Sequence, residues 1–238
     1  MKARLALAAL AVLPMLPASA QAQAQKSTAT LQVPERLYAG YLGAFAVKDA
    51  SDRDGNATVS LQRRVGSGWA AVTSEPRRSD ATELYGKLPA GRQSLRAVLV
   101  TDDGQRTPVA SRTLTVLREG RRTPSRRDDG RYAPAKSEKG PVRFSIAGGG
   151  KTLRGFQASV TTFCFGPTID SNRLLVFAAK LDPVRVAPDG AVVGVLRTKD
   201  HGREALVGRL RRGRFTGTID VSLSTCNGQR KLTAVRVR

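Results

Sequence analysis

Residues 205–223, ALVGRLRRGRFTGTIDVSL, decide the fold that the sequence predicts. Two β-prone runs, 205–210 and 215–223, flank the turn residues Arg211-Arg-Gly213. Alternate residues from Phe215 to Leu223 are expected to share one face of a strand, because side chains in a strand alternate between faces. The stretch therefore predicts an antiparallel hairpin with arginines at its tip.

Short strands of the same kind fill the first half of the mature chain, residues 26–117. The expected strands are 28–33, 56–63, 69–72, 94–100 and 111–116. Turn signals separate them, and no segment has helical periodicity. Several short strands at this spacing predict an antiparallel β-sandwich.

Residues 140–238 are expected to form a second β-sandwich. One strand face is expected to hold Phe156, Ala158, Val160, Thr162 and Cys164. The apolar run 174–179 is interpreted as a central strand, and Asp189-Gly190 predicts a hairpin turn. The stretch 148–152, GGGKT, lacks the full spacing of a phosphate loop, so it too is interpreted as a hairpin turn.

Residues 118–139 differ from both halves because 118–130 contain no apolar residue. Such a stretch cannot bury enough surface to offset the entropy lost on ordering. It is predicted to be a basic flexible linker, and its arginines could also act as a basic arm: Arg121, Arg122, Arg126 and Arg127. The predicted fold class is all-β, with two antiparallel β-sandwich domains joined by this charged linker.

The N-terminus, residues 1–24, has the three-part order of a secretory signal peptide. Lys2 and Arg4 precede an apolar run over 5–16, and small residues follow over 18–22. The apolar run is too short to span a bilayer, and no later stretch is long enough to do so. The mature protein is expected to be secreted, periplasmic or associated with the cell envelope.

Cys164 and Cys226 are the only cysteines. An oxidising compartment favours a disulfide between them, which the chain-entropy model values at about 4 kcal/mol. Cys226 falls out of phase with the apolar face of 215–223, so the strand is expected to end or bulge before it.

The formal net charge of +21 is concentrated in the second half, where residues 140–238 hold 17 basic and 6 acidic residues. Most basic residues are Arg and Ala is abundant, so genomic composition bias is the favoured explanation for much of this charge. The alternative explanation is attraction to a polyanion such as an acidic wall polymer, anionic lipid or nucleic acid.

Two resemblances follow from these segments. The run 59–72, then Leu88-Pro-Ala-Gly-Arg92 and 94–100, resembles bacterial immunoglobulin-like domains of secreted proteins, without the core disulfide of antibody domains. The second half resembles a disulfide-containing β domain that recurs in secreted actinobacterial proteins. Its matching features are Gly130-Arg-Tyr132, Thr162-Phe-Cys-Phe165, Pro188-Asp-Gly190, Val207-Gly208, Gly217 and Cys226-Asn-Gly228. Ala191 and Leu232 lie near places where that domain has Phe and Trp. The resemblances imply sandwich domains outside the membrane and no particular chemistry.

Catalytic motifs are weak in this sequence. His201 is the single histidine and lies in a loop, so it is interpreted as a solvated side chain and not as a catalytic base. A glycosidase would need two facing carboxylates, and the acids available for that role are Asp170, Asp182, Asp200, Glu204 and Asp220. The sequence predicts no catalytic residue and no cofactor.

One stretch resembles part of a calcium loop. Asp52 and Asp54 are weak candidate calcium ligands, but Ala50 and Leu61 stand where the first and last ligands belong. A turn between strands explains the same residues, because Asp, Asn and Gly favour turns.

Binding residues are easier to nominate than catalytic ones. The candidate anion-binding residues are Arg209, Arg211, Arg212 and Arg214; the alternative is a solvated turn that keeps the sheet edge soluble. Trp69 and Tyr85 are candidates for carbohydrate contact, although Trp69 is more readily interpreted as a core anchor. Specific nucleic-acid binding is not expected, because the chain has only 7 Phe, 4 Tyr and 1 Trp, and most Phe are assigned to the core.

Three functional hypotheses remain open. The first is a secreted, non-catalytic binding or surface-interaction protein whose partner is an anionic wall polymer, an anionic surface or another protein. The second is an accessory hydrolase that acts on wall or extracellular polysaccharide. The third is a structural module with no dedicated ligand.

Overall fold

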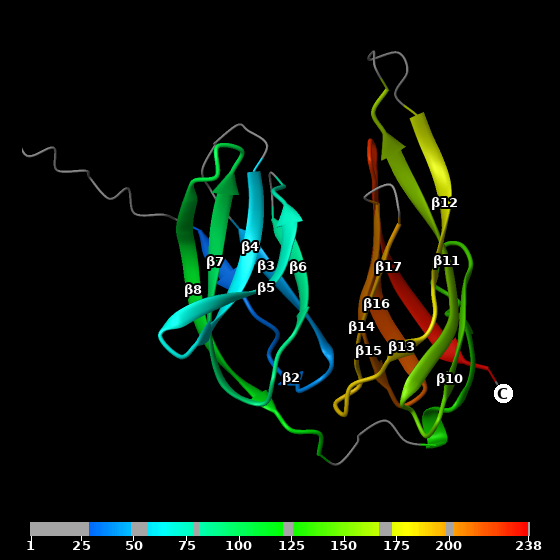
Figure 1. Cartoon of the computed structure of the whole chain (residues 1–238). Helices are drawn as coiled ribbons and strands as arrows, with labels where there is room; N and C mark the ends of the chain where they lie inside the picture. Colours follow the sequence, from blue (N-terminus) through cyan, green and yellow to red (C-terminus); the bar gives the residue numbers. More distant parts are fainter. Residues whose placement is uncertain are drawn as a thin grey trace, which may run out of the picture.

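A computed structural model describes residues 29–48, 57–78, 81–120, 126–166, 173–198 and 202–237. All regular elements in these ranges are β-strands apart from one 3-10 turn. The strands fall into two units, β1–β8 and β9–β17, which lie side by side (Figure 1). No helix in the described ranges is long and apolar enough to cross a membrane. The predicted signal peptide, 1–24, lies outside the described residues, as do Arg121 and Arg122.

The first unit consists of two sheets. Its strands are β1 (Thr30–Gln32), β2 (Leu37–Tyr38), β3 (Leu42–Lys48), β4 (Ala57–Val65), β5 (Gly68–Pro76), β6 (Thr82–Lys87), β7 (Gly91–Thr101) and β8 (Arg106–Leu117). One sheet has the order β1-β3-β6 and the other β2-β8-β7-β4-β5. Buried residues of both sheets, such as Phe45 and Leu84 from the first and Leu61 and Leu95 from the second, belong to one hydrophobic cluster.

The prediction of purely antiparallel sheets is wrong at one pairing. β2 pairs with β8 in parallel, with Leu37 opposite Val116. This two-residue strand follows β1 directly and crosses to the other sheet, so it reaches the edge of β8 from the opposite direction to a hairpin partner.

All described strands of the second unit belong to one sheet, so the two facing sheets of the sandwich predicted for residues 140–238 are not found there. Its elements are η1 (Arg126–Asp128), β9 (Gly130–Pro134), β10 (Val142–Ala147), β11 (Thr152–Cys164), β12 (Arg173–Leu181), β13 (Val184–Arg185), β14 (Ala191–Arg197), β15 (Arg203–Arg211), β16 (Arg214–Leu223) and β17 (Cys226–Arg236). The order is β12-β11-β10-β9-β17-β16-β15-β14, and β13 pairs with β11.

This sheet curls around its own core. β11 pairs with β10 and also with β17, while Val186, directly after β13, bridges to Val192 of β14. The enclosed cluster centres on Phe144, which stacks on Tyr132 with 4.8 Å between ring centroids and meets Phe215 edge-on at 5.3 Å. The aromatic residues of the second unit are therefore mostly core, as the sequence predicted.

The hairpin predicted over 205–223 is confirmed. β15 and β16 pair from Arg203 opposite Ser222 to Arg211 opposite Arg214. Phe215 is fully buried, and a Cβ on Gly208 would lie 2.5 Å from its Cζ. The ring of Phe215 thus occupies the space above Gly208, which explains the glycine in the middle of a strand.

Part of the predicted linker is ordered structure. Residues 126–134 form η1 and β9, and β9 lies between β10 and β17 in the sheet. Tyr132 anchors this segment because its ring is buried and its hydroxyl donates to the Asp128 carbonyl at 2.8 Å. The segment was predicted to be a flexible linker because charged residues dominate its composition, and Tyr132 is its one large apolar side chain.

The interpretation of 174–179 as a central strand is also wrong. β12 lies at one edge of the sheet, where Leu174 is 70% exposed and Val176 is 75% exposed. An apolar run predicts a strand buried on both faces only if something covers both faces, and no described residue does so here.

Candidate functional site

The four candidate anion-binding arginines divide into two groups. Arg209 is half-buried on β15, and its Nη2 lies 3.3 Å from Oδ2 of the buried Asp189. Arg211 and Arg214 are exposed and lie directly opposite each other where β15 and β16 meet. Arg212 occupies the turn between them with a φ of 50°.

Asp128 joins this hairpin tip to η1. Its buried carboxylate accepts a hydrogen bond from the main-chain N of Gly213, with 2.8 Å between N and Oδ1. Arg126 and Arg127 directly precede Asp128, so the hydrogen bond of Asp128 places them beside the hairpin tip. Arg126 and Arg127, the described part of the basic arm, and the basic hairpin therefore belong to one surface, although Asp128 and Gly213 are 85 residues apart in sequence.

Arg236 of β17 connects the same parts. Its main-chain N donates to the Gly213 carbonyl at 2.8 Å, and its guanidinium donates to the Arg127 carbonyl. Arg131 of β9 lies next to it, because the Arg131 carbonyl accepts from the N of Val237.

We call this surface the basic end. It is made of eight exposed residues: Arg126, Arg127, Arg131, Lys151, Arg211, Arg212, Arg214 and Arg236. The acidic side chains at this end accept hydrogen bonds from backbone amides. Asp129 accepts from the N of Gly149 at 2.9 Å and from the N of Gly150 at 2.7 Å. The glycine turn between β10 and β11 thus binds an anion, and that anion is the chain's own carboxylate.

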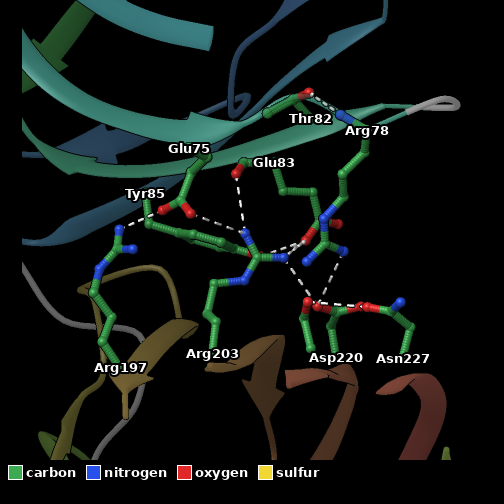
Figure 2. Close-up of polar contacts among 10 residues, drawn as sticks. Glu75, Arg78, Thr82, Glu83, Tyr85, Arg197, Arg203, Asp220 and Asn227 are labelled. Atoms are coloured by element: carbon green, nitrogen blue, oxygen red, sulfur yellow. Dashed lines mark hydrogen bonds and ion pairs between the residues drawn. The ribbon is translucent and has the colours of Figure 1, made fainter. Parts of the chain in front are cut away.

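A second polar cluster lies between the two units and centres on Arg203 (Figure 2). Arg203 opens β15 and is only 4% exposed. Its Nη2 lies 2.9 Å from Asp220 of β16 and 3.5 Å from Glu83 of β6, and its Nη1 lies 3.8 Å from Glu75 of β5. Its Nη1 also donates to the Glu83 carbonyl at 3.2 Å.

Tyr85 packs against this guanidinium, with 5.1 Å from its ring centroid to Cζ of Arg203. The Tyr85 hydroxyl donates to Oε2 of Glu83 at 2.5 Å. Burial raises the pKa of Tyr85 well above its ordinary value, and the Glu83 charge adds to this. Burial alone would lower the pKa of Arg203, but its hydrogen bond to Asp220 and the neighbouring Tyr85 and Glu75 reverse the direction and raise it. Arg203 is therefore held as a cation inside the interface.

Two further arginines complete the cluster. Arg197 of β14 contacts Glu75, and Arg78 lies 3.7 Å from Asp220. The ion pairs of this cluster thus join three arginines to three carboxylates, which balances the charge across the interface. Arg203 and Glu75 are buried in this network, whereas the side chains of Arg197 and Glu83 are 52% and 36% exposed. The contacts of Arg203 are therefore the ones expected to hold the two units in a fixed orientation.

Arg185 makes a separate contact between the units. Its guanidinium lies 4.2 Å from the ring centroid of Tyr41, Nη1 donates to the Gly40 carbonyl at 3.4 Å, and Nη2 lies 3.9 Å from Glu119. A groove of about 590 Å³ borders this contact, with Leu42 on one wall and residues of β14 on the other. Its walls mix apolar and basic side chains with two acidic ones, Glu35 and Asp182.

The acids proposed for hydrolysis are dispersed. Asp220 shares the Arg203 guanidinium with two other carboxylates, those of Glu75 and Glu83. Glu204 is buried and accepts from the main-chain N of Lys180 at 2.7 Å; burial raises the pKa of its carboxyl. Asp182 is exposed beside Pro183. Asp170, Asp200 and His201 lie outside the described residues.

The two aromatic candidates, Trp69 and Tyr85, lie in environments opposite to those expected from the sequence. Trp69 is not a core anchor: it begins β5 beside a turn, is 37% exposed, and lies under the Arg96 guanidinium at 4.3 Å from the ring centroid. Tyr85 is buried in the interface between the units.

The disulfide between Cys164 and Cys226 is confirmed, with an S–S distance of 2.06 Å. β16 ends at Leu223, and Cys226 begins β17 after a two-residue turn, so the predicted strand end before Cys226 is also confirmed. The bond links β11 to β17 where these strands pair. A disulfide in a chain with no other cysteine indicates an oxidising, extracytoplasmic compartment.

The candidate calcium ligands Asp52 and Asp54 lie outside the described residues. Within the part of the chain that the structure describes, no group of three His, Cys, Asp or Glu side chains could hold a metal ion.

Comparison with known proteins does not identify a ligand for these surfaces. No protein-family model matches the chain, and a search of curated proteins finds no match.

Proposed function

We propose that this protein is an extracytoplasmic, non-catalytic binding protein that attaches to an anionic envelope polymer or surface through its basic end. The observation that carries the proposal is the hydrogen bond from Gly213 to Asp128, which unites two arginine clusters on one surface. Guanidinium groups held on strand ends and a 3-10 turn present their charge at fixed positions, which suits repeated phosphate or carboxylate groups.

Several finer assignments accompany this proposal. The shared core of the two sheets in the first unit supports an immunoglobulin-like β-sandwich. The disulfide, together with the signal-peptide pattern of residues 1–24, supports secretion or residence in the cell envelope. The role of the first unit is then to hold the second through the Arg203 cluster.

The alternative of an accessory hydrolase has one supporting observation, the approach of Asp220 to Glu75 and Glu83. Arg203 engages all three carboxylates, and inverting or retaining glycosidases need one carboxyl that donates a proton to the substrate. The arrangement thus supports a structural ion network better than an acid–base pair. Turnover of purified wall polysaccharide that is abolished by Asp220→Asn would favour the hydrolase.

The test is retention of the mature protein on purified cell wall at about 20 mM and about 500 mM salt, where the Debye length falls from roughly 20 Å to about 4 Å. The variant is Arg211→Gln/Arg212→Gln/Arg214→Gln. The matched control is Arg92→Gln/Arg106→Gln/Arg112→Gln, which removes the same charge from exposed arginines of the first unit. We expect the first variant to lose at least tenfold in retention at low salt and the control to lose less than twofold.

Equal losses in the two variants would mean that the arginine excess acts only as a diffuse field. Retention of neither variant nor wild type at low salt would rule out wall binding and leave a protein partner or a structural role.

A further inference from the structure

The edge strand β12 carries an exposed apolar run in a protein that is otherwise strongly charged. Residues 174–179 have the sequence LLVFAA, with Arg173 before them and Lys180 after them. Leu174 and Val176 are among the most exposed large apolar side chains of the described residues. A long apolar edge strand is normally covered or protected by charge, because it offers a template for pairing.

The backbone of this edge is available over most of its length. The N–H of Lys180 points away from β11, since it donates to the Glu204 carboxylate on β15. Successive residues of an antiparallel strand direct their N–H and C=O groups to opposite edges. Residues 174, 176 and 178 therefore direct theirs the same way as Lys180, and in the described part of the chain no strand pairs with this edge.

Both faces of β12 expose apolar side chains next to these groups. On the outer face Leu174 lies opposite Phe163 of β11, and Phe163 meets Phe165 edge-on with 4.9 Å between centroids. On the core face Leu175 is 50% exposed beside the partly buried Phe177. An added strand with apolar residues on either face would continue both surfaces.

We propose that β12 accepts an extended peptide segment of another protein as an additional strand, with apolar residues along its length and an acidic residue at each end. Arg173 and Lys180 bracket the apolar run, so acidic ends match both cations. A second copy of this chain fits less well, because each copy brings the same two cations and a formal net charge of +21. Main-chain hydrogen bonds provide the affinity in this mode of recognition, and the flanking side chains provide the specificity.

The experiment uses the mature full-length protein and a fluorescent nine-residue peptide of alternating valine and threonine with an aspartate at each end. We expect saturable binding by fluorescence polarisation, together with slower hydrogen exchange at the amides of Leu174, Val176 and Ala178. Val176→Pro removes one outward N–H and Val176→Lys adds a cation at the centre; each should weaken binding at least tenfold. Val65→Lys changes an exposed valine of the first unit and should leave binding unchanged.

Circular dichroism and thermal unfolding of each variant verify folding before binding is compared. Absence of peptide binding to the wild type, or equal binding by Val176→Pro, overturns the proposal. Two other outcomes also overturn it: dimerisation of the wild type in sedimentation experiments that Val176→Lys abolishes, and co-sedimentation with phosphatidylcholine vesicles that Val176→Lys abolishes.

Discussion

At the scale of one residue, the buried carboxylate of Glu204 accepts a hydrogen bond that a backbone carbonyl of a neighbouring strand would otherwise accept from β12. Its Oε2 accepts from the N of Lys180 at 2.7 Å, where β12 would otherwise find a backbone carbonyl. The hydrogen bond satisfies the amide, but burial raises the pKa of the carboxyl because water no longer solvates the charge. Ionisation of Glu204 therefore opposes folding.

The first prediction concerns Glu204→Gln, which keeps an acceptor oxygen and removes the charge. A raised pKa in the folded state gives stability that is present below the unfolded pKa, near 4.5, and is lost as pH rises through the folded pKa. We expect equal unfolding free energies for wild type and variant at pH 4 and a variant that is the more stable of the two at pH 8, where the buried carboxylate of the wild type is charged. Urea unfolding at both pH values measures this, and a variant that is less stable at pH 8 contradicts it.

The sequence placed Glu204 among acids available for catalysis and could not indicate its role. Its partner is a main-chain amide 24 residues earlier, on a strand that meets β15 only because the sheet curls. The same limit applies to Arg203, whose carboxylate partners lie on β5, β6 and β16. Residue type and spacing reveal patterns within a short stretch of sequence. These contacts depend on how distant strands come together, so they leave no such pattern.

Individual elements were easier to predict than their positions. Strand alternation correctly identified the buried faces of β11 and β16, since period-two patterning reflects a local contrast between core and solvent. Whether β12 is an edge strand or a central strand depends on whether another strand pairs with its second edge. The apolar run alone does not indicate this. β9 was missed because a single buried Tyr132 holds it in a charged segment.

The second prediction concerns the contact between η1 and the β15–β16 hairpin. Asp128→Ala removes the buried carboxylate that accepts from the N of Gly213. We expect a loss of about 1.5–3 kcal/mol in unfolding free energy, the usual cost of a hydrogen bond to a charged group. We also expect faster hydrogen exchange at the Gly213 amide and at least threefold weaker retention on cell wall, because the two arginine clusters separate.

Asp102→Ala is the control, because it removes one exposed acid from the β7–β8 turn and changes the net charge equally. A diffuse field would strengthen retention slightly in both variants, since each gains positive charge. Stronger retention by Asp128→Ala would therefore contradict a positioned basic end.

At the scale of the whole molecule, the interface between the units contains a network of charged side chains. Three arginines and three carboxylates meet there, and Arg203 is the member that touches all three acids. On the other side of the interface, Arg185 reaches across to Gly40 and Tyr41. The orientation of the two units should therefore respond to changes in this network.

The third prediction concerns Arg203→Met, which keeps much of the side-chain volume and removes the central cation. Asp220, Glu75 and Glu83 then remain close together, and breaking a buried ion pair typically costs about 3–5 kcal/mol. We expect a larger radius of gyration by small-angle X-ray scattering and separate unfolding transitions for the two units by calorimetry. Adding Glu83→Gln to Arg203→Met should restore the single transition, because Arg197 then still pairs with Glu75 and Arg78 with Asp220, and no carboxylate is left over. An unchanged radius and a single transition in Arg203→Met would mean that Arg185 and the groove residues hold the units together without the cluster.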